Sequence, residues 1–188
     1  MPAQAAAIED HTLASELAAY AARWPGEADT VRLFVELLAQ GPGPFHRECL
    51  AGHFTASCWL VDHRGERALL THHRKLGLWL QPGGHADGEP DLRIAALKEA
   101  REESGLPGLR LEGGLFDLDR HWIPEHGGVP AHWHYDVRYV VRAGDDEAYV
   151  VSEESHDLAW RRIEELAIES GADPSVQRMA RKWLARAC

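Results

Sequence analysis

The sequence has few cysteines, and their spacing argues against a disulfide-stabilised fold. Only three are present, Cys49, Cys58 and Cys188, and no two of them form a CxxC pair. An odd set without that spacing is not a disulfide framework, and it favours a reducing compartment.

Long hydrophobic runs are also missing. No apolar segment is long enough to span a bilayer, so we expect no membrane partner. The first residues, MPAQAAAIEDHT, lack the basic segment and apolar run of a secretory signal. Together these features predict a cytoplasmic protein.

Positive charge is scarce relative to negative charge. Lys and Arg number 20 against 30 Asp and Glu, which gives a formal net charge of −10. This balance argues against a nucleic-acid partner, which is bound mainly through basic contacts to phosphates. A small anionic substrate stays open, because a bound cation can reverse the local field. The motifs GxxxxGK(S/T), GxSxG and HExxH are absent, so P-loop and serine-hydrolase chemistry have no support.

What is present is an ordinary globular composition for 188 residues, with 45% hydrophobic and 27% charged residues. Apolar residues at helical spacing predict one helix from Ala3 to Trp24 and another over 29–39, followed by GPGP at 41–44. We therefore expect an α/β layered domain at 44–188, preceded by an N-terminal helical extension at 1–43. Within it, strands are predicted at 53–61, 66–73, 78–80, 109–120, 131–142, 147–151 and 157–161, and helices at 90–104, 163–168 and 174–187.

The predicted helix at 90–104 carries a row of acidic residues. Glu99, Glu102 and Glu103 fall within about a third of its circumference, at about 100° per residue. Like charges at this spacing repel, so something must offset them. The preceding pair Gly83–Gly84 lets backbone approach an ion, and clustered oxygen ligands favour a hard cation such as Mg²⁺ or Mn²⁺. A solvated face neutralised locally by Lys98 is the alternative.

This stretch resembles the Nudix box, G-x5-E-x7-R-E-U-x-E-E-x-G-U, in which U is a bulky aliphatic residue. Six residues match the pattern at its full spacing: Gly84, Glu99, Glu102, Glu103, Gly105 and Leu106. The preceding WLQPGG is also typical of the family. Three positions depart from the pattern: Lys98 replaces the Arg, Ala100 the aliphatic residue, and Pro90 the first Glu, with Glu89 one residue early. The resemblance implies a Nudix-type α/β/α sandwich with a mixed sheet.

The same resemblance implies a catalytic metal site. Its ligands, which are also the catalytic residues, would be the carboxylates of Glu99, Glu102 and Glu103, together with the carbonyl of Gly83. The family hydrolyses nucleoside diphosphates linked to another moiety, and related pyrophosphates. The expected partner is therefore a small-molecule diphosphate, with Lys98 and Glu154 among its contacts. The helical extension would pack on the domain or form a homodimer interface.

Twelve histidines form a second pattern. His132 and His134 alternate with Trp133, so they share one face of a predicted strand. This arrangement resembles a second member of the superfamily, type I isopentenyl-diphosphate isomerase, which holds a separate metal with His and Glu ligands. Carried over, those ligands fall on His46, His53, His85, His132 and His134, a set suited to a transition metal such as Zn²⁺. The substrate phosphate is an alternative partner for His85, His132 and His134.

The isomerase resemblance is incomplete at its reactive groups. Its catalytic cysteine falls on Gly83 and its catalytic glutamate on His134, so isomerase activity is not expected. A metal-dependent pyrophosphohydrolase is the leading hypothesis. The alternatives are an isomerase-like enzyme that uses the histidine site and a non-catalytic ligand sensor on the same fold, although the intact glutamate triad argues against the sensor.

Overall fold

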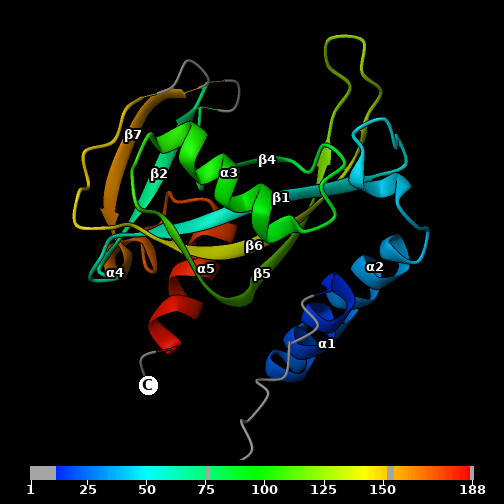
Figure 1. Cartoon of the computed structure of the whole chain (residues 1–188), viewed down its shortest axis with the longest axis horizontal. Helices are drawn as coiled ribbons and strands as arrows, with labels where there is room; N and C mark the ends of the chain where they lie inside the picture. Colours follow the sequence, from blue (N-terminus) through cyan, green and yellow to red (C-terminus); the bar gives the residue numbers. More distant parts are fainter. Residues whose placement is uncertain (1–11, 75–76, 152–154, 187–188) are drawn as a thin grey trace, which may run out of the picture.

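A mixed sheet of seven strands forms the centre of the molecule, with helices on both of its faces (Figure 1). The structure, a computed structural model, describes residues 12–74, 77–151 and 155–186. The strands are β1 (His53–Val61), β2 (Arg67–His73), β3 (Trp79–Leu80), β4 (Gly83–His85), β5 (Arg110–Ile123), β6 (His132–Arg142) and β7 (Ser155–Arg162). The helices are α1 (Leu13–Arg23), α2 (Ala28–Leu38), α3 (Leu92–Ser104), α4 (Ile163–Leu166) and α5 (Pro174–Ala185), with short 3-10 helices η1 (Pro25–Glu27) and η2 (Gly43–Phe45).

The sheet is built around β1, which has neighbours on both edges. One edge runs parallel to β6, from His53 opposite His134 to Val61 opposite Arg142. The other edge pairs antiparallel with β4 and, at Val61, with β2. β5 lies antiparallel beyond β6, while β3 and β7 flank β2. The short strand β4 therefore brings the double glycine against the middle strand of the sheet.

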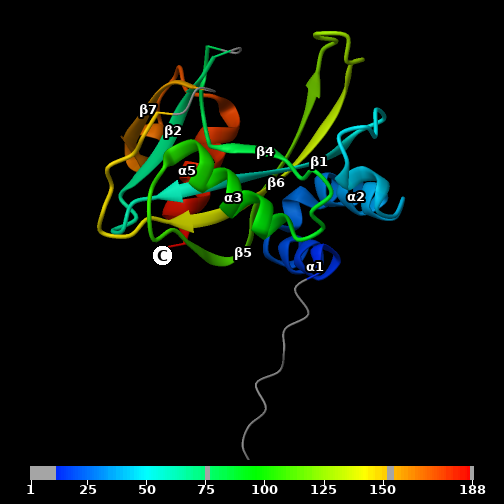
Figure 2. The same ribbon diagram turned by 45° about the horizontal axis from the view of Figure 1, so that its top comes forward.

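Strand β1 is buried along its whole length, and its alternating side chains separate two layers. Cys58 and Leu60 belong to the core beneath α3, together with Ala100 of that helix. Trp59 and Val61 point the other way, into the core covered by α4 and α5. Figure 2 shows α3 and α5 on opposite sides of the sheet. This is the predicted α/β/α sandwich with a mixed sheet.

The N-terminal pair, α1 and α2, is present as predicted and packs against the sheet in a third buried cluster. Leu17 of α1 and Phe34 of α2 have no exposed surface. Both lie in one cluster with Phe54 of β1 and Tyr135 of β6. The ring centroid of Phe34 is 5.2 Å from that of Tyr135 in an edge-on contact. The pair is thus continuous with the sandwich rather than detached from it.

A buried ion network also joins the N-terminal pair to α5. Lys182, only 6% exposed, places its Nζ 2.7 Å from the carboxylates of both Asp117 and Glu27 and hydrogen-bonds Tyr20. Arg138, 2% exposed, pairs with the same Asp117. Removing one partner from such a network leaves a buried charge uncompensated, which is strongly destabilising. These contacts therefore fix α1, α5 and β5 relative to one another.

Three predicted features differ in the structure. Helix α3 begins after Asp91 rather than at Pro90, because the Asp91 side chain accepts a backbone N–H of the first turn and caps the helix. Residues 147–151 do not form the predicted strand. The N–H of Val150 instead donates to the carbonyl of Ser104 at the end of α3. Strand β4 was not predicted, since two glycines carry little strand propensity.

The remaining differences are short shifts at the ends of helices and strands. The first predicted helix is described only from Leu13, and its expected beginning lies outside the described residues. The last two helices end at Leu166 and Ala185, slightly before the predicted positions. Among the helices of residues 12–74, 77–151 and 155–186, none is both long and apolar enough to cross a membrane.

We expect Phe34→Ala to lower the free energy of unfolding by about 3 to 5 kcal/mol, because it removes a fully buried ring from the shared core. Val35→Ala on the same helix should cost less than about 1 kcal/mol, since Val35 is 47% exposed. Urea unfolding followed by circular dichroism measures both. Equal losses in the two variants would contradict the packing of α2 into the core.

Candidate active site

Helix α3 is positioned by its capped ends and by small residues on its inner face. Asp91 caps its beginning, and Gly105 ends it in the left-handed conformation (φ +66°), with its N–H donated to the carbonyl of Arg101. Ala96 and Ala100 are fully buried against the sheet. The alanine at position 100, a departure from the Nudix pattern, therefore allows a close contact between helix and sheet.

The three predicted carboxylates occupy different environments. Glu103 is 8% exposed, and its Oε1 accepts the N–H of Gly83 at 2.8 Å. Glu99 lies over Gly84, where an added Cβ would meet its carboxylate atoms at 2.6 to 2.9 Å. The side chain of Glu102 is 58% exposed. Two of the three carboxylates thus converge on β4, and the third is directed outward.

Lys98, a predicted substrate contact, offsets part of the repulsion between these carboxylates. Its Nζ lies 3.6 Å from Glu99 and 3.4 Å from Glu102. The negative charge of Glu99 raises the pKa of Lys98. The alternative raised by the sequence, local neutralisation of charge, therefore applies to Glu102. The charge of Glu103 is stabilised differently, by a hydrogen bond from the backbone N–H of Gly83.

A floor of polar side chains beneath β4 was not predicted. A Cβ at Gly83 would lie 2.2 Å from Ser57 Oγ, so only glycine fits at this position. Ser57 and Thr55 donate hydrogen bonds to the buried carboxylate of Asp136, at 2.8 and 3.0 Å. Arg138 donates to the same carboxylate through Nε at 2.7 Å. The double glycine is therefore clamped between this floor and the carboxylates of α3.

Five imidazole rings gather where β4 ends. His53, His132 and His134 form their centre, because one nitrogen from each ring lies within 4.8 Å of the others. The ring of His85 is 5.2 Å from that of His53 and 5.1 Å from that of His134. His121, which was not predicted, faces His134 across the β5–β6 pairing, with its ring 5.4 Å away. Only a knowledge of this register could have identified it.

Two hydrogen bonds leave nitrogen lone pairs in the centre of this histidine cluster. His53 Nδ1 lies 3.2 Å from the Cys49 carbonyl, and His132 Nδ1 lies 2.7 Å from the Pro130 carbonyl. A carbonyl can only accept, so each Nδ1 carries the proton and each Nε2 keeps a lone pair. Among the described residues, His53 Nε2 is buried without a partner, and His132 Nε2 lies 3.2 Å from His134 Nε2. This donor set fits a metal ion.

Burial lowers the pKa of three imidazoles of the cluster, those of His53, His85 and His134. It is the main reason that the pKa of His85 falls to about 4 and that of His134 to about 2. Burial also lowers the pKa of His53. Metal ligation requires the neutral form of imidazole, and protonation competes with it. At neutral pH the rings of His53, His85 and His134 are therefore in the form that can bind a cation.

Of the other predicted residues, His46 and Glu89 lie apart from these groups. His46 is exposed, and its ring lies beside Gly88 rather than among the clustered rings. Glu89 Oε1 accepts the N–H of Asp91 at 2.9 Å, which gives this residue a role in starting α3. Glu154 lies outside the described residues.

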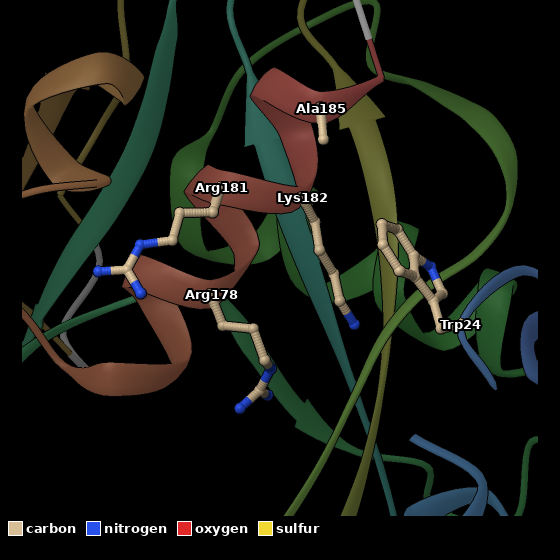
Figure 3. A pocket seen from close by; sticks show the side chains of 5 residues that line it. All are labelled: Trp24, Arg178, Arg181, Lys182 and Ala185. Atoms are coloured by element: carbon tan, nitrogen blue, oxygen red, sulfur yellow. The ribbon is translucent and has the colours of Figure 1, made fainter. Parts of the chain in front are cut away.

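A hollow of about 300 Å³ lies elsewhere, between the N-terminal pair and α5 (Figure 3). Its lining residues are Trp24, Arg178, Arg181, Lys182 and Ala185. Arg178 and Lys182 are already paired with Asp117. None of the lining residues belongs to α3 or to the histidine cluster, so we place the candidate site at β4 and not in this hollow.

The order of these elements corresponds to a known family. The family model described as NUDIX domain matches residues 52–184. The chain belongs to the Nudix family. It is therefore a Nudix hydrolase, and the match contains α3, β4 and all five rings of the histidine cluster. Among curated proteins, none gives a significant match.

Solved structures support the Nudix fold. A NUDIX-family hydrolase from Clostridium perfringens is 23% identical, with a TM-score of 0.55 over 72% of this chain and 98% of that one. The Ap4A hydrolase of C. elegans in a binary complex is 19% identical, with a TM-score of 0.56 over 71% and 96%. The MutT protein of Methanosarcina mazei Go1 is 15% identical, with a TM-score of 0.57 over 74% and 97%. At these identities the likeness establishes the fold alone.

We expect Gly84→Ala to weaken Mn²⁺ binding by at least about tenfold, because its Cβ would displace the Glu99 carboxylate. Gly171→Ala is the matched control, since nothing lies within 4 Å of a Cβ at that position. Electron paramagnetic resonance of free Mn²⁺ in a titration measures both affinities. Unchanged affinity in Gly84→Ala would argue against Glu99 as part of the site.

Proposed function

We propose that this Nudix hydrolase cleaves a diphosphate linkage in a nucleoside diphosphate derivative or a related small molecule. The observation that carries the proposal is the convergence of Glu99 and Glu103 on β4, at the spacing of the Nudix box. The Gly83 N–H donates to Glu103, and the Glu99 carboxylate lies directly over Gly84. A diphosphate can approach these carboxylates only with cations between them, since both are negatively charged.

Within this proposal, Mg²⁺ or Mn²⁺ binds to Glu99 and Glu103, with Glu102 and the Gly83 carbonyl as further ligands. When bound, such an ion neutralises phosphate charge and makes a coordinated water more acidic. Glu103 has one oxygen fixed by the Gly83 N–H, so its other oxygen has a set direction. Glu99, which lies next to Gly84 and near Lys98, is the candidate for accepting a proton from water.

We further propose that the histidine cluster holds a second cation, of the Zn²⁺ type. Its support is the orphaned Nε2 of His53, which faces the converging nitrogens of His132 and His134. His85 belongs to the same cluster and follows Gly84 directly in β4. Within this proposal, substrate phosphate contacts both groups of ligands.

The geometry of the site does not support the isomerase-like alternative. Its reactive thiol would fall on Gly83, which rests on Ser57 and has no side chain. The nearby Cys58 is fully buried, and burial raises the pKa of its thiol. A buried thiol of raised pKa is a poor nucleophile and a poor acid catalyst at neutral pH.

We expect Glu103→Gln to lower kcat by at least about 100-fold, because it removes the charge of a buried ligand while keeping its shape. The assay incubates the protein with Mg²⁺ or Mn²⁺ and a panel of dinucleoside polyphosphates, nucleotide sugars, ADP-ribose and dNTPs, and measures released phosphate or mononucleotide. Glu36→Gln, on α2 and 58% exposed, is the control and should retain full activity. Undiminished turnover in Glu103→Gln would reject the box as the site, and binding without turnover in the wild type would favour a sensor.

We expect His53→Ala to abolish tight Zn²⁺ binding while leaving Mn²⁺ binding at the carboxylates unchanged, because it removes the nitrogen of the histidine cluster that, among the described residues, is buried without a partner. Elemental analysis after dialysis against Zn²⁺ measures the stoichiometry. His126→Ala, at an exposed position in the β5–β6 loop, is the control. His46→Ala tests the fifth predicted ligand. A wild-type protein that retains no Zn²⁺ would remove the second site from the proposal.

A further inference from the structure

The loop after β4 is fastened to the segment before β1. Asp87 is the only residue other than glycine with a positive φ in the described parts of the chain, at 50°. The N–H of Gly88 donates to the carbonyl of Phe45 at 2.8 Å. The Asp87 carboxylate accepts two hydrogen bonds from Arg47, from Nε at 2.8 Å and from Nη2 at 2.6 Å. The strained backbone of Asp87 thus occurs where its carboxylate holds the Arg47 guanidinium in one orientation.

This ion pair lies at the rim of the histidine cluster. Asp87 is two residues from His85, whose ring is 5.2 Å from that of His53. Arg47 is therefore the cation on the histidine side of β4, as Lys98 is on the carboxylate side.

Lys98 and Arg47 differ in how many of their N–H groups are already paired with carboxylates. Lys98 lies between Glu99 and Glu102, whose repulsion it offsets. Arg47 uses only one edge of its guanidinium on Asp87, and within the described residues its Nη1 has no hydrogen-bond partner. Its side chain is 53% exposed. A guanidinium held along one edge presents its other N–H groups in the fork geometry that suits phosphate oxygens.

Charge balance points the same way. A positively charged guanidinium beside a cluster of cation-binding imidazoles is unfavourable unless an anion joins them. Asp87 supplies one negative charge to Arg47. A divalent cation at the histidines would leave the group with excess positive charge, which a phosphate would neutralise.

We propose that Arg47, oriented by Asp87, binds the phosphate of the substrate that lies on the histidine side of β4. The inference rests on the proposed function, because it takes the diphosphate to extend from Glu99 toward the histidine cluster. It assigns to Arg47 the binding of substrate and to Asp87 a positioning role. Arg47 lies outside the Nudix box and Asp87 stands at one of its variable positions, and the sequence alone did not single them out.

The test measures binding of inorganic pyrophosphate by calorimetry to the full chain saturated with Mg²⁺. Arg47→Gln should weaken binding at least about tenfold, and Arg47→Lys should recover part of the loss. With a hydrolysed substrate from the panel, Arg47→Gln should raise KM by a similar factor and change kcat less than about threefold. Asp87→Asn should give an intermediate rise in KM.

Arg32→Gln is the matched control, since it removes the same charge from an exposed ion-paired arginine on α2. It should leave pyrophosphate binding unchanged, and an equal loss in both variants would overturn the inference as a general charge effect. Unchanged binding in Arg47→Gln, while Glu103→Gln abolishes hydrolysis, would overturn this inference and leave the proposed function standing. A wild type that neither binds pyrophosphate nor hydrolyses any member of the panel would overturn both.

Discussion

The site depends on one steric constraint, the absence of side chains at two consecutive positions of β4. Gly83 touches Ser57 below it, and Gly84 touches the Glu99 carboxylate above it. Any side chain at either position would separate the strand from its floor or from α3. Because β4 fits in this gap, the Gly83 N–H can donate to Glu103. His85, the last residue of β4, then lies beside the other imidazoles. The carboxylates and the histidines are therefore parts of one arrangement.

The two halves of this arrangement balance charge in different ways. On the α3 side, negative carboxylates are offset by Lys98 and by a backbone amide. On the histidine side, burial lowers the pKa of His53, His85 and His134, and ring nitrogens of His132 and His134 face one another. Hard oxygen ligands and borderline nitrogen ligands prefer different cations, so two different metals could be held a short distance apart without exchanging sites.

Much of the fold and half of the site could be predicted from the sequence, because their signals are local. Glu99, Glu102 and Glu103 are spaced along a single helix, and His132 and His134 along a single strand. His121 was not recognised, nor was the hydrogen-bonding role of Asp136, since both arise from the pairing of distant strands, which spacing does not reveal. β4 was missed for a related reason. Its glycines have little propensity for a strand, and they occupy these positions because no side chain fits there. The position of Glu103 relative to Gly83 likewise required the tertiary structure.

The buried ammonium of Lys182 sets a lower limit on the piece of this chain that can fold alone. Its counter-charges come from Asp117, within the Nudix match, and from Glu27, before it. A fragment cut at residue 52 would keep the cation and lose Glu27 and Tyr20, and it would also uncover Phe54 and Tyr135. We therefore expect folding to require residues before the family boundary, and recombinant fragments should begin ahead of α1.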